Sequence, residues 1–265
     1  MDAILQFKEM QKVTWSGFAV LENFTASVAP KLVRFAKIRP GQAVLDVGCG
    51  TGVVALTAAR AGARVTGVDL TPALVARAKE HAALAGAEVT FLEGDAEAIP
   101  LPDSAFDVVV SQFGHMFAPR PDVVVKEMLR VLKPGGTIAF STWPPELIVG
   151  QSFALMGQYL PPPPEGVSPP VQWGDPTIVR ERLGTAVKGL TFHRDTMVFP
   201  VLSPQHYRLF MEQNFLPVQK LLGTLDASDP ARAAKFRRET EELGAMYFED
   251  NAVRQGFLMS RAEKA

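Results

Sequence analysis

The sequence contains a single cysteine, Cys49, among its 265 residues. One cysteine cannot form an intrachain disulfide, and it excludes metal sites that are built from several thiols, so we expect no bound metal. A long basic run is also missing: 27 Lys and Arg residues are spread along the chain against 28 Asp and Glu, which gives a formal net charge of −1. This balance disfavours nucleic acid as a partner.

Long apolar runs are equally absent. No stretch reaches the ~18 consecutive apolar residues that a transmembrane helix needs, so no membrane span is expected. The N-terminal residues also lack the pattern of a secretory signal peptide. We therefore expect a soluble, cytoplasmic protein, and a length of 265 residues fits either one large domain or a domain with a cap.

The most informative stretch that is present covers residues 44–52 and reads V-L-D-V-G-C-G-T-G. The apolar run at 43–47 predicts a buried strand, and an Ala-, Val- and Leu-rich helix is expected after the glycines. This arrangement allows the backbone to approach a nucleotide-like ligand. Glycine is needed because a Cβ atom would obstruct the positive φ angles or the ligand. The cysteine is interpreted as a small side chain beside the ligand, not as a nucleophile. The expected turn consists of Gly48, Cys49, Gly50 and Gly52.

Acidic residues stand at the ends of three expected strands. Asp46 ends the first strand, and no Lys-Ser or Lys-Thr pair follows the glycines, so this position suits an ammonium group better than a pyrophosphate. Asp69 ends a strand expected at 64–69 and suits a ribose diol. Asp95 follows a strand expected at 89–92 and is placed to hydrogen-bond an adenine edge. Ammonium, ribose and adenine together describe S-adenosylmethionine, although a strand-end Asp can also simply cap a turn.

Five motifs occur in order along residues 40–143. They are D-V-G-C-G-T-G (46–52), G-V-D-L-T-P (67–72), G-D-A-E-A-I-P-L-P (94–102), F-D-V-V-V-S-Q-F-G (106–114) and R-V-L-K-P-G-G (130–136). This set resembles the class I S-adenosylmethionine-dependent methyltransferases, in the broad ubiquinone/menaquinone-biosynthesis-like group that acts on small molecules. The resemblance implies S-adenosylmethionine as cofactor and S-adenosylhomocysteine as product. It implies a cofactor site that includes Asp46, Gly48, Cys49, Gly50, Gly52, Asp69, Leu70, Asp95, Ala96, Ser111, Gln112 and Trp15.

The alternation of strands and helices up to residue 143 predicts an α/β fold with a parallel sheet and helices on both faces. The resemblance specifies a doubly wound, mostly parallel seven-stranded sheet with an antiparallel last strand, and we expect a helical cap beside it. Ligands of such sheets bind beyond the carboxyl ends of the strands. Four of the expected strands end there, at Asp46, Asp69, Asp95 and the pair Ser111 and Gln112.

Four segments are expected along the chain. They are an N-terminal helical segment (1–37), an S-adenosylmethionine-binding core (38–143), a proline-rich lid (144–177), and the last sheet strands (178–265) with a helical cap insertion (204–250). In similar enzymes the N-terminal segment often lies across the cofactor. Trp15 therefore either covers the methionine end of the ligand or anchors the N-terminal helix.

Methyl transfer from S-adenosylmethionine needs few catalytic groups from the protein, because the sulfonium methyl group is already activated. In-line transfer mainly requires that the acceptor is aligned and that water is excluded, and a hydroxyl or acidic-carbon acceptor would also need a base. His115 is the candidate base, because the pKa of an unperturbed His is ~6.5. Alternatively, His115 is only part of the wall of the pocket. We expect a small, rather apolar acceptor that is methylated at oxygen, carbon or nitrogen. Candidates for its pocket, or for ordinary packing, are Met116, Phe117, Trp143 and Trp173.

Two other functions stay open at this point. An NAD-dependent dehydrogenase would show G-x-G-x-x-G, whereas this chain has G-x-G-x-G, and the stretch L-K-P-G-G would have no role in it. A non-catalytic S-adenosylmethionine-binding protein fits the motifs equally well, because they report cofactor binding and not turnover. Nothing in the sequence fixes the acceptor or the oligomeric state.

Overall fold

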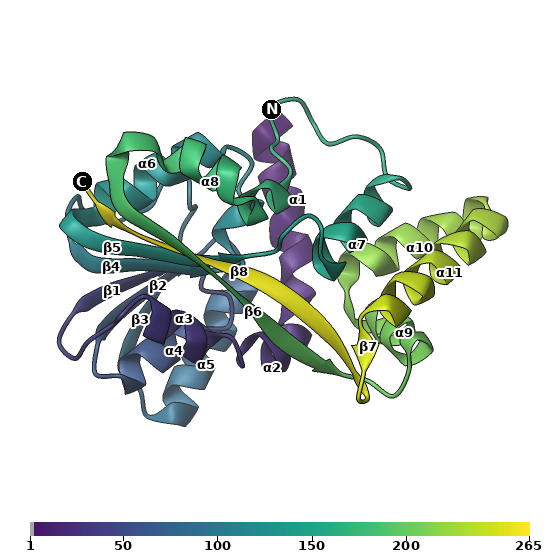
Figure 1. Cartoon of the computed structure of the whole chain (residues 1–265), viewed down its shortest axis with the longest axis horizontal. Helices are drawn as coiled ribbons and strands as arrows, with labels where there is room; N and C mark the ends of the chain where they lie inside the picture. The colour runs from purple at the N-terminus through teal and green to yellow at the C-terminus, as the bar shows by residue number, and fades with distance from the viewer. Residues whose placement is uncertain (1–2) are drawn as a thin grey trace.

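The computed structural model describes residues 3–265, which form a mixed sheet with helices on both faces (Figure 1). The strand order is β3-β2-β1-β4-β5-β8-β6, and the short β7 pairs with β8. Strands β1 to β5 are parallel to one another, whereas β8 runs antiparallel between β5 and β6. This confirms the expected doubly wound sheet with an antiparallel last strand. The strands are β1 (Ala43–Val47), β2 (Arg64–Asp69), β3 (Val89–Glu93), β4 (Phe106–Gln112), β5 (Leu132–Thr142), β6 (Val187–Pro200), β7 (Phe248–Glu249) and β8 (Ala252–Lys264).

Helices from both halves of the chain cover the sheet, as Figure 1 shows. On one face lie α3 (Ala29–Phe35), α4 (Val53–Arg60) and α5 (Pro72–Ala85), and on the other lie α6 (Pro121–Val131) and α8 (Pro176–Leu183). The helices α5, α6 and α8 each begin at a proline, because the first helical position needs no N–H and suits the fixed φ of that residue. Thr71, in an extended conformation, directly precedes α5, and Pro72 is the first residue of that helix.

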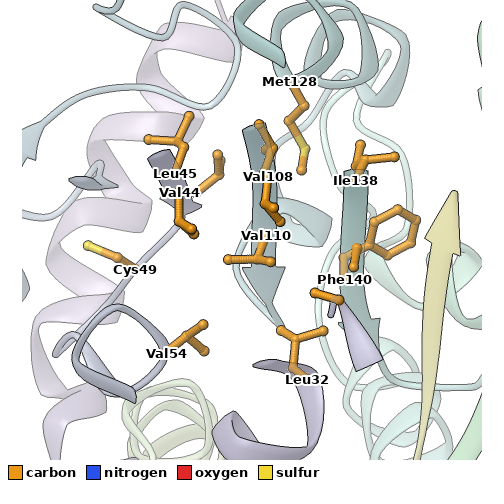
Figure 2. Packing of buried hydrophobic residues seen from close by; sticks show 14 of the residues in the cluster. Leu32, Val44, Leu45, Cys49, Val54, Val108, Val110, Met128, Ile138 and Phe140 are labelled. Atoms are coloured by element: carbon orange, nitrogen blue, oxygen red, sulfur yellow. The ribbon is translucent and has the colours of Figure 1, made fainter. Parts of the chain in front are cut away.

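The main core fills the space between the central strands and these helices. Every residue of β4 except two is buried, as expected of a parallel strand that is covered on both faces. Figure 2 shows apolar side chains of β4 and β5 packed between residues of α3 and α6. Members of this cluster that the figure labels include Leu32, Val108, Val110, Met128, Ile138 and Phe140.

A separate layer of helices lies beyond one end of the sheet, at the right of Figure 1. It consists of α7 (Ile148–Gly157), α9 (Pro204–Asn214), α10 (Leu216–Ser228) and α11 (Pro230–Met246). Helices occupy the interval 204–250 as expected, and α7, from the proline-rich interval, shares their apolar cluster. The division of the chain into four segments stays a prediction. Among residues 3–265 no helix combines the length and apolarity needed to cross a membrane.

The N-terminal segment is helical but broken. It contains α1 (Ala3–Trp15), a 3-10 helix (Ser16–Leu21) and α2 (Glu22–Thr25) before α3 begins at Ala29. Pro30 therefore lies in the first turn of α3, where its missing N–H is tolerated. Helix α1 stands beside the sheet between its parallel strands and the helical layer (Figure 1).

Candidate active site

A cavity with an empty volume of about 970 Å³, which includes open solvent at its mouth, lies at the carboxyl ends of the parallel strands. The N-terminal segment contributes a wall to it. Of the residues expected from the sequence, those that line the cavity are Trp15, Gly48, Cys49, Gly50, Asp69, Leu70, Asp95, Ala96 and Gln112. Those expected but not found among its described lining residues are Asp46, Gly52, Ser111 and His115.

The glycine loop shows which of its members faces ligand space. All three glycines have positive φ angles, of 66°, 53° and 85° along the chain. A Cβ atom on Gly48 would come within 2.8 Å of the Cα atom of Gly114, and one on Gly52 within 2.9 Å of the Phe91 ring. A Cβ atom on Gly50 would meet no described heavy atom within 4 Å. The outer two glycines are therefore required by packing, and Gly50 by its backbone angle beside open cavity space.

Asp46 lies under this loop rather than in the cavity. Its side chain is buried, with 1% of the residue exposed, and Oδ2 accepts a hydrogen bond from the backbone N–H of Ala55 at 3.0 Å. Its Oδ1 atom has no hydrogen-bond partner within the described part of the chain. Burial raises the pKa of Asp46 to about 7, and the nearby charge of Asp69 adds to this. Asp46 thus supports the first turn of α4.

Asp69 combines a structural contact with a place on the cavity wall. Its two oxygens accept backbone N–H groups from Gly50, at 2.8 Å, and from Thr71, at 2.9 Å. These bonds fix the glycine loop and the start of α5. Burial raises the pKa of Asp69, and the two backbone hydrogen bonds oppose that shift. Each carboxylate oxygen has a second lone pair, so the side chain retains the capacity to accept a ligand hydroxyl.

Asp95 is held by a cluster of ionic contacts that sequence reasoning missed. The ammonium group of Lys8, on α1, donates to Asp95 at 2.6 Å and to Glu97 at 2.5 Å. Glu97 also accepts the guanidinium and the backbone N–H of Arg120. Two cations and two carboxylates therefore balance one another. Lys8 is only 6% exposed, so this cluster attaches α1 to the edge of the cavity.

Aromatic side chains form the wall on the side of β4. Trp15 packs against Phe117, with ring centroids 4.4 Å apart, and against Phe18 at 5.6 Å, and all three line the cavity. Phe113 lines it too, with φ of 58°, which is unusual for a residue other than glycine. Its ring stacks on Trp143 at 3.8 Å. Of the apolar residues expected at an acceptor pocket, only Phe117 is in the lining; buried core positions hold Met116, Trp143 and Trp173.

His115 is enclosed behind this wall. Its ring lies 4.6 Å from both Phe140 and Trp173, and only 1% of the residue is exposed. Neither ring nitrogen has a hydrogen-bond partner among residues 3–265. Burial lowers the pKa of His115 to about 3, with a smaller contribution from the charge of Arg182. The enclosure disfavours the base, and His115 is not among the described residues of the pocket wall either.

The end of β4 joins the N-terminal segment to the sheet. Ser111 donates to the carbonyl of Val47 at 2.6 Å and accepts the N–H of His115, so its hydroxyl ties β4 to β1. Gln112 lines the cavity, and its amide nitrogen donates to the carbonyl of Thr25 at 2.9 Å.

The face of the N-terminal segment that lines the cavity has a sequence pattern that the motifs do not reveal. The lining residues from this segment recur at steps of three and four, which places them on one side of a nearly continuous helix. They mix polar, charged and aromatic types, so a search for apolar stripes does not find them. They are Lys8, Gln11, Trp15, Phe18, Glu22 and Thr25, and we call this set the N-terminal strip.

Comparisons with known proteins agree with this geometry. The sequence model of a family described as "Methyltransferase domain" matches residues 45–140. An uncharacterised protein of Mycobacterium tuberculosis is 34% identical over 244 residues, which cover 92% of this chain and 89% of that protein. The demethylmenaquinone methyltransferase of Thermus thermophilus is 41% identical over 104 residues, which cover 38% of this chain and 47% of that protein.

Solved structures share the fold. A putative methyltransferase from Bacillus halodurans has a TM-score of 0.60 at 22% identity, covering 90% of this chain and 99% of its own. The phosphoethanolamine N-methyltransferase 2 of Haemonchus contortus, in complex with S-adenosyl-L-methionine, has a TM-score of 0.53 at 20% identity, covering 88% of this chain and 51% of its own.

Proposed function

Because the chain belongs to the class I S-adenosylmethionine-dependent methyltransferases, we propose that it methylates a small, largely apolar acceptor at oxygen, carbon or nitrogen. The cavity at the strand ends carries this proposal, since it brings the glycine loop, Asp69 and Asp95 together with a wall of aromatic rings. S-adenosylmethionine is the cofactor of this family. We propose that it lies along the strand ends with its adenine toward Asp95, its ribose toward Asp69 and its methionine end toward the glycine loop.

The charges on the cavity wall support this cofactor. The lining includes three carboxylates, on Glu22, Asp69 and Asp95, and one cation, Lys8, which is already paired with Asp95. S-adenosylmethionine carries a sulfonium and an ammonium against one carboxylate, so it brings a net positive charge to a negative wall. NAD would bring two phosphates to the same wall. The electrostatics therefore favour S-adenosylmethionine over NAD.

When bound, S-adenosylmethionine supplies an activated methyl group whose in-line displacement leaves a neutral thioether. The residues of this chain position the acceptor and keep water out. Trp15 and Phe117 offer an apolar surface beside the end of β4, and Phe113 is fixed there by its stack on Trp143. His115 is enclosed and is not among the described lining residues, and burial keeps its ring uncharged at neutral pH, so this mechanism assigns no proton transfer to it.

Calorimetric titration of the purified protein with S-adenosylmethionine, S-adenosylhomocysteine and NAD tests the proposal. We expect micromolar binding of the first two and none of NAD. Incubation with a methyl-labelled donor and a panel of small apolar acceptors then tests turnover. Binding of NAD alone would overturn the cofactor placement. Tight cofactor binding without label transfer to any acceptor would instead indicate a non-catalytic S-adenosylmethionine-binding protein.

A further inference from the structure

Glu22 is a lining residue of the cavity, and only one of its two carboxylate oxygens has polar partners in the described chain. It belongs to the N-terminal strip and lies on α2, one helical turn before Thr25. Its Oε1 atom is 3.6 Å from a guanidinium nitrogen of Arg77 and 3.5 Å from Nε2 of His81. Its Oε2 atom is buried and has no hydrogen-bond partner in the stretch 3–265. A buried carboxylate oxygen without a donor is costly, so a bound donor at this atom would be stabilising.

The surroundings of Glu22 tie it to the glycine loop. The other ring nitrogen of His81, Nδ1, lies 3.0 Å from the carbonyl oxygen of Thr51, and Thr51 lines the cavity. Arg77 and His81 both lie on α5, and both approach the same oxygen of Glu22, Oε1. The carboxylate is fixed beside the loop at which we place the methionine end of the cofactor.

The other carboxylates of the cavity wall accept more hydrogen bonds from the protein than Glu22 does. Asp69 accepts two backbone N–H groups, and Asp95 accepts the ammonium of Lys8 and the N–H of Glu97. Asp46, to which the sequence assigns an ammonium group, is not among the described residues that line the cavity. Glu22 is therefore the wall carboxylate with the greatest unused capacity to bind a cation.

We propose that Glu22 is the counter-ion of an ammonium group that binds in this cavity. The proposal rests on the function proposed above, because two sources of that group follow from it. One is the α-ammonium of the cofactor, to which the position beside the glycine loop points. The other is an amine on the acceptor, which would narrow the acceptor class from apolar molecules in general to alkylamines.

Glu22→Gln removes the charge and keeps the shape of the side chain. Glu80→Gln is a matched control, because Glu80 also pairs with Arg77, is mostly exposed and is not among the described lining residues. Both variants are titrated calorimetrically with S-adenosylhomocysteine and with its analogue that lacks the α-amino group. If the cofactor supplies the ammonium, Glu22→Gln weakens S-adenosylhomocysteine by about tenfold or more and leaves the deaminated analogue within about twofold. Glu80→Gln changes neither, and equal melting temperatures exclude misfolding.

A second titration addresses the acceptor as the source. Hexylamine and hexanol are added to each protein with and without saturating S-adenosylhomocysteine. Selective loss of hexylamine binding in Glu22→Gln, with S-adenosylhomocysteine binding intact, assigns the ammonium to the acceptor. If Glu22→Gln binds S-adenosylhomocysteine, its deaminated analogue and hexylamine as the unchanged protein does, the proposal is overturned. Equal weakening of S-adenosylhomocysteine and its deaminated analogue also overturns it.

The failure of the proposed function looks different. In that case the unchanged protein binds neither S-adenosylmethionine nor S-adenosylhomocysteine. If hexylamine still binds and its binding depends on Glu22, the ammonium site is supported and the methyltransferase function is not.

Discussion

Asp46 and His115 are two buried groups whose pKa values move in opposite directions. Burial raises the pKa of Asp46 to about 7 from 3.8 and lowers that of His115 to about 3 from 6.5. Between about pH 4 and 6.5, folding therefore binds a proton at Asp46 and releases one at His115. Stability from Asp46 is lost as the pH rises toward 7, whereas stability from His115 is lost as the pH falls toward 3. In the cofactor-free protein the two contributions to the pH dependence of stability therefore oppose each other.

Single substitutions separate these titrations. Compared with the unchanged protein, Asp46→Asn shifts the slope of the free energy of unfolding against pH between 5 and 6 upward by up to about 1.4 kcal/mol per pH unit, because the titration of Asp46 is removed. His115→Leu shifts this slope downward by a similar amount, because the titration of His115 is removed. Urea denaturation at a series of pH values measures both slopes against that of the unchanged protein. Equal slopes in the two variants would contradict the assigned shifts.

Asp69 links the fold to the proposed ribose contact. Asp69→Ala weakens S-adenosylhomocysteine binding by roughly 10- to 100-fold, since a hydrogen bond to a charged group contributes about 1.5–3 kcal/mol. It also lowers the melting temperature, because the N–H groups of Gly50 and Thr71 lose their acceptor. Calorimetry and thermal denaturation measure the two effects. Asp103→Ala, at an exposed position outside the described lining, is the control, and an unchanged affinity in Asp69→Ala would remove the ribose contact.

The sequence predicts which residues end the strands but not how deep their side chains lie. Asp46, Asp69 and Asp95 all follow the expected strands, and two of the three reach the cavity. The third is held under the loop by the N–H of Ala55, a contact nine residues away that no strand pattern encodes. The same holds for His115, whose enclosure depends on Trp173 from a distant segment.

At the scale of elements, α1 is attached to the sheet by Lys8. Lys8→Met leaves Asp95 and Glu97 with fewer donors, while Arg120 still binds Glu97. We expect amide hydrogen exchange in α1 to become roughly 10- to 100-fold faster, as the loss of charged hydrogen bonds worth about 1.5–3 kcal/mol predicts.

Hydrogen exchange read by mass spectrometry on peptides from residues 3–15 measures this change. Lys12→Met is the matched control, because Lys12 pairs with Glu9 one turn away at an exposed site. Exchange that is equally slow in both variants would show that α1 is held by its apolar contacts instead.

The helices and strands in the first half of the chain are predicted well, because each is indicated by residues within or next to it. The glycines, the prolines at helix starts and the apolar strand runs are local features. The N-terminal strip is harder, because the helix that carries it is broken into α1, a 3-10 helix and α2, and its residues are chemically mixed. Pro30 marks only the start of α3, and the cavity contacts of the strip depend on residues more than a hundred positions away, such as Phe117.

At the scale of the whole molecule, β6 and β8 extend from the sheet into the helical layer (Figure 1). Trp143 and Trp173 belong to the sheet core, whereas Trp15 packs against the helical layer, to which the three tyrosines, Tyr159, Tyr207 and Tyr247, belong. Because the two long strands pass through both regions, we expect one cooperative transition. In a Trp15→Phe variant, tryptophan fluorescence reports the sheet core alone, and it should give the same midpoint in urea as near-ultraviolet tyrosine dichroism.

A control for this experiment is far-ultraviolet dichroism, which reports both regions together. A tyrosine midpoint clearly below the tryptophan midpoint would contradict the expectation and would mean that the helical layer unfolds by itself.

The position of β8 has a consequence for biosynthesis. β8 follows β5 and β6 in the chain, yet it lies between them and pairs with both. While the polypeptide is being translated, β5 and β6 therefore emerge before the strand that joins them, and each waits with an unpaired edge. Such edges pair readily with other chains. The nascent protein therefore exposes these edges to intermolecular pairing during the interval before β8 leaves the ribosome.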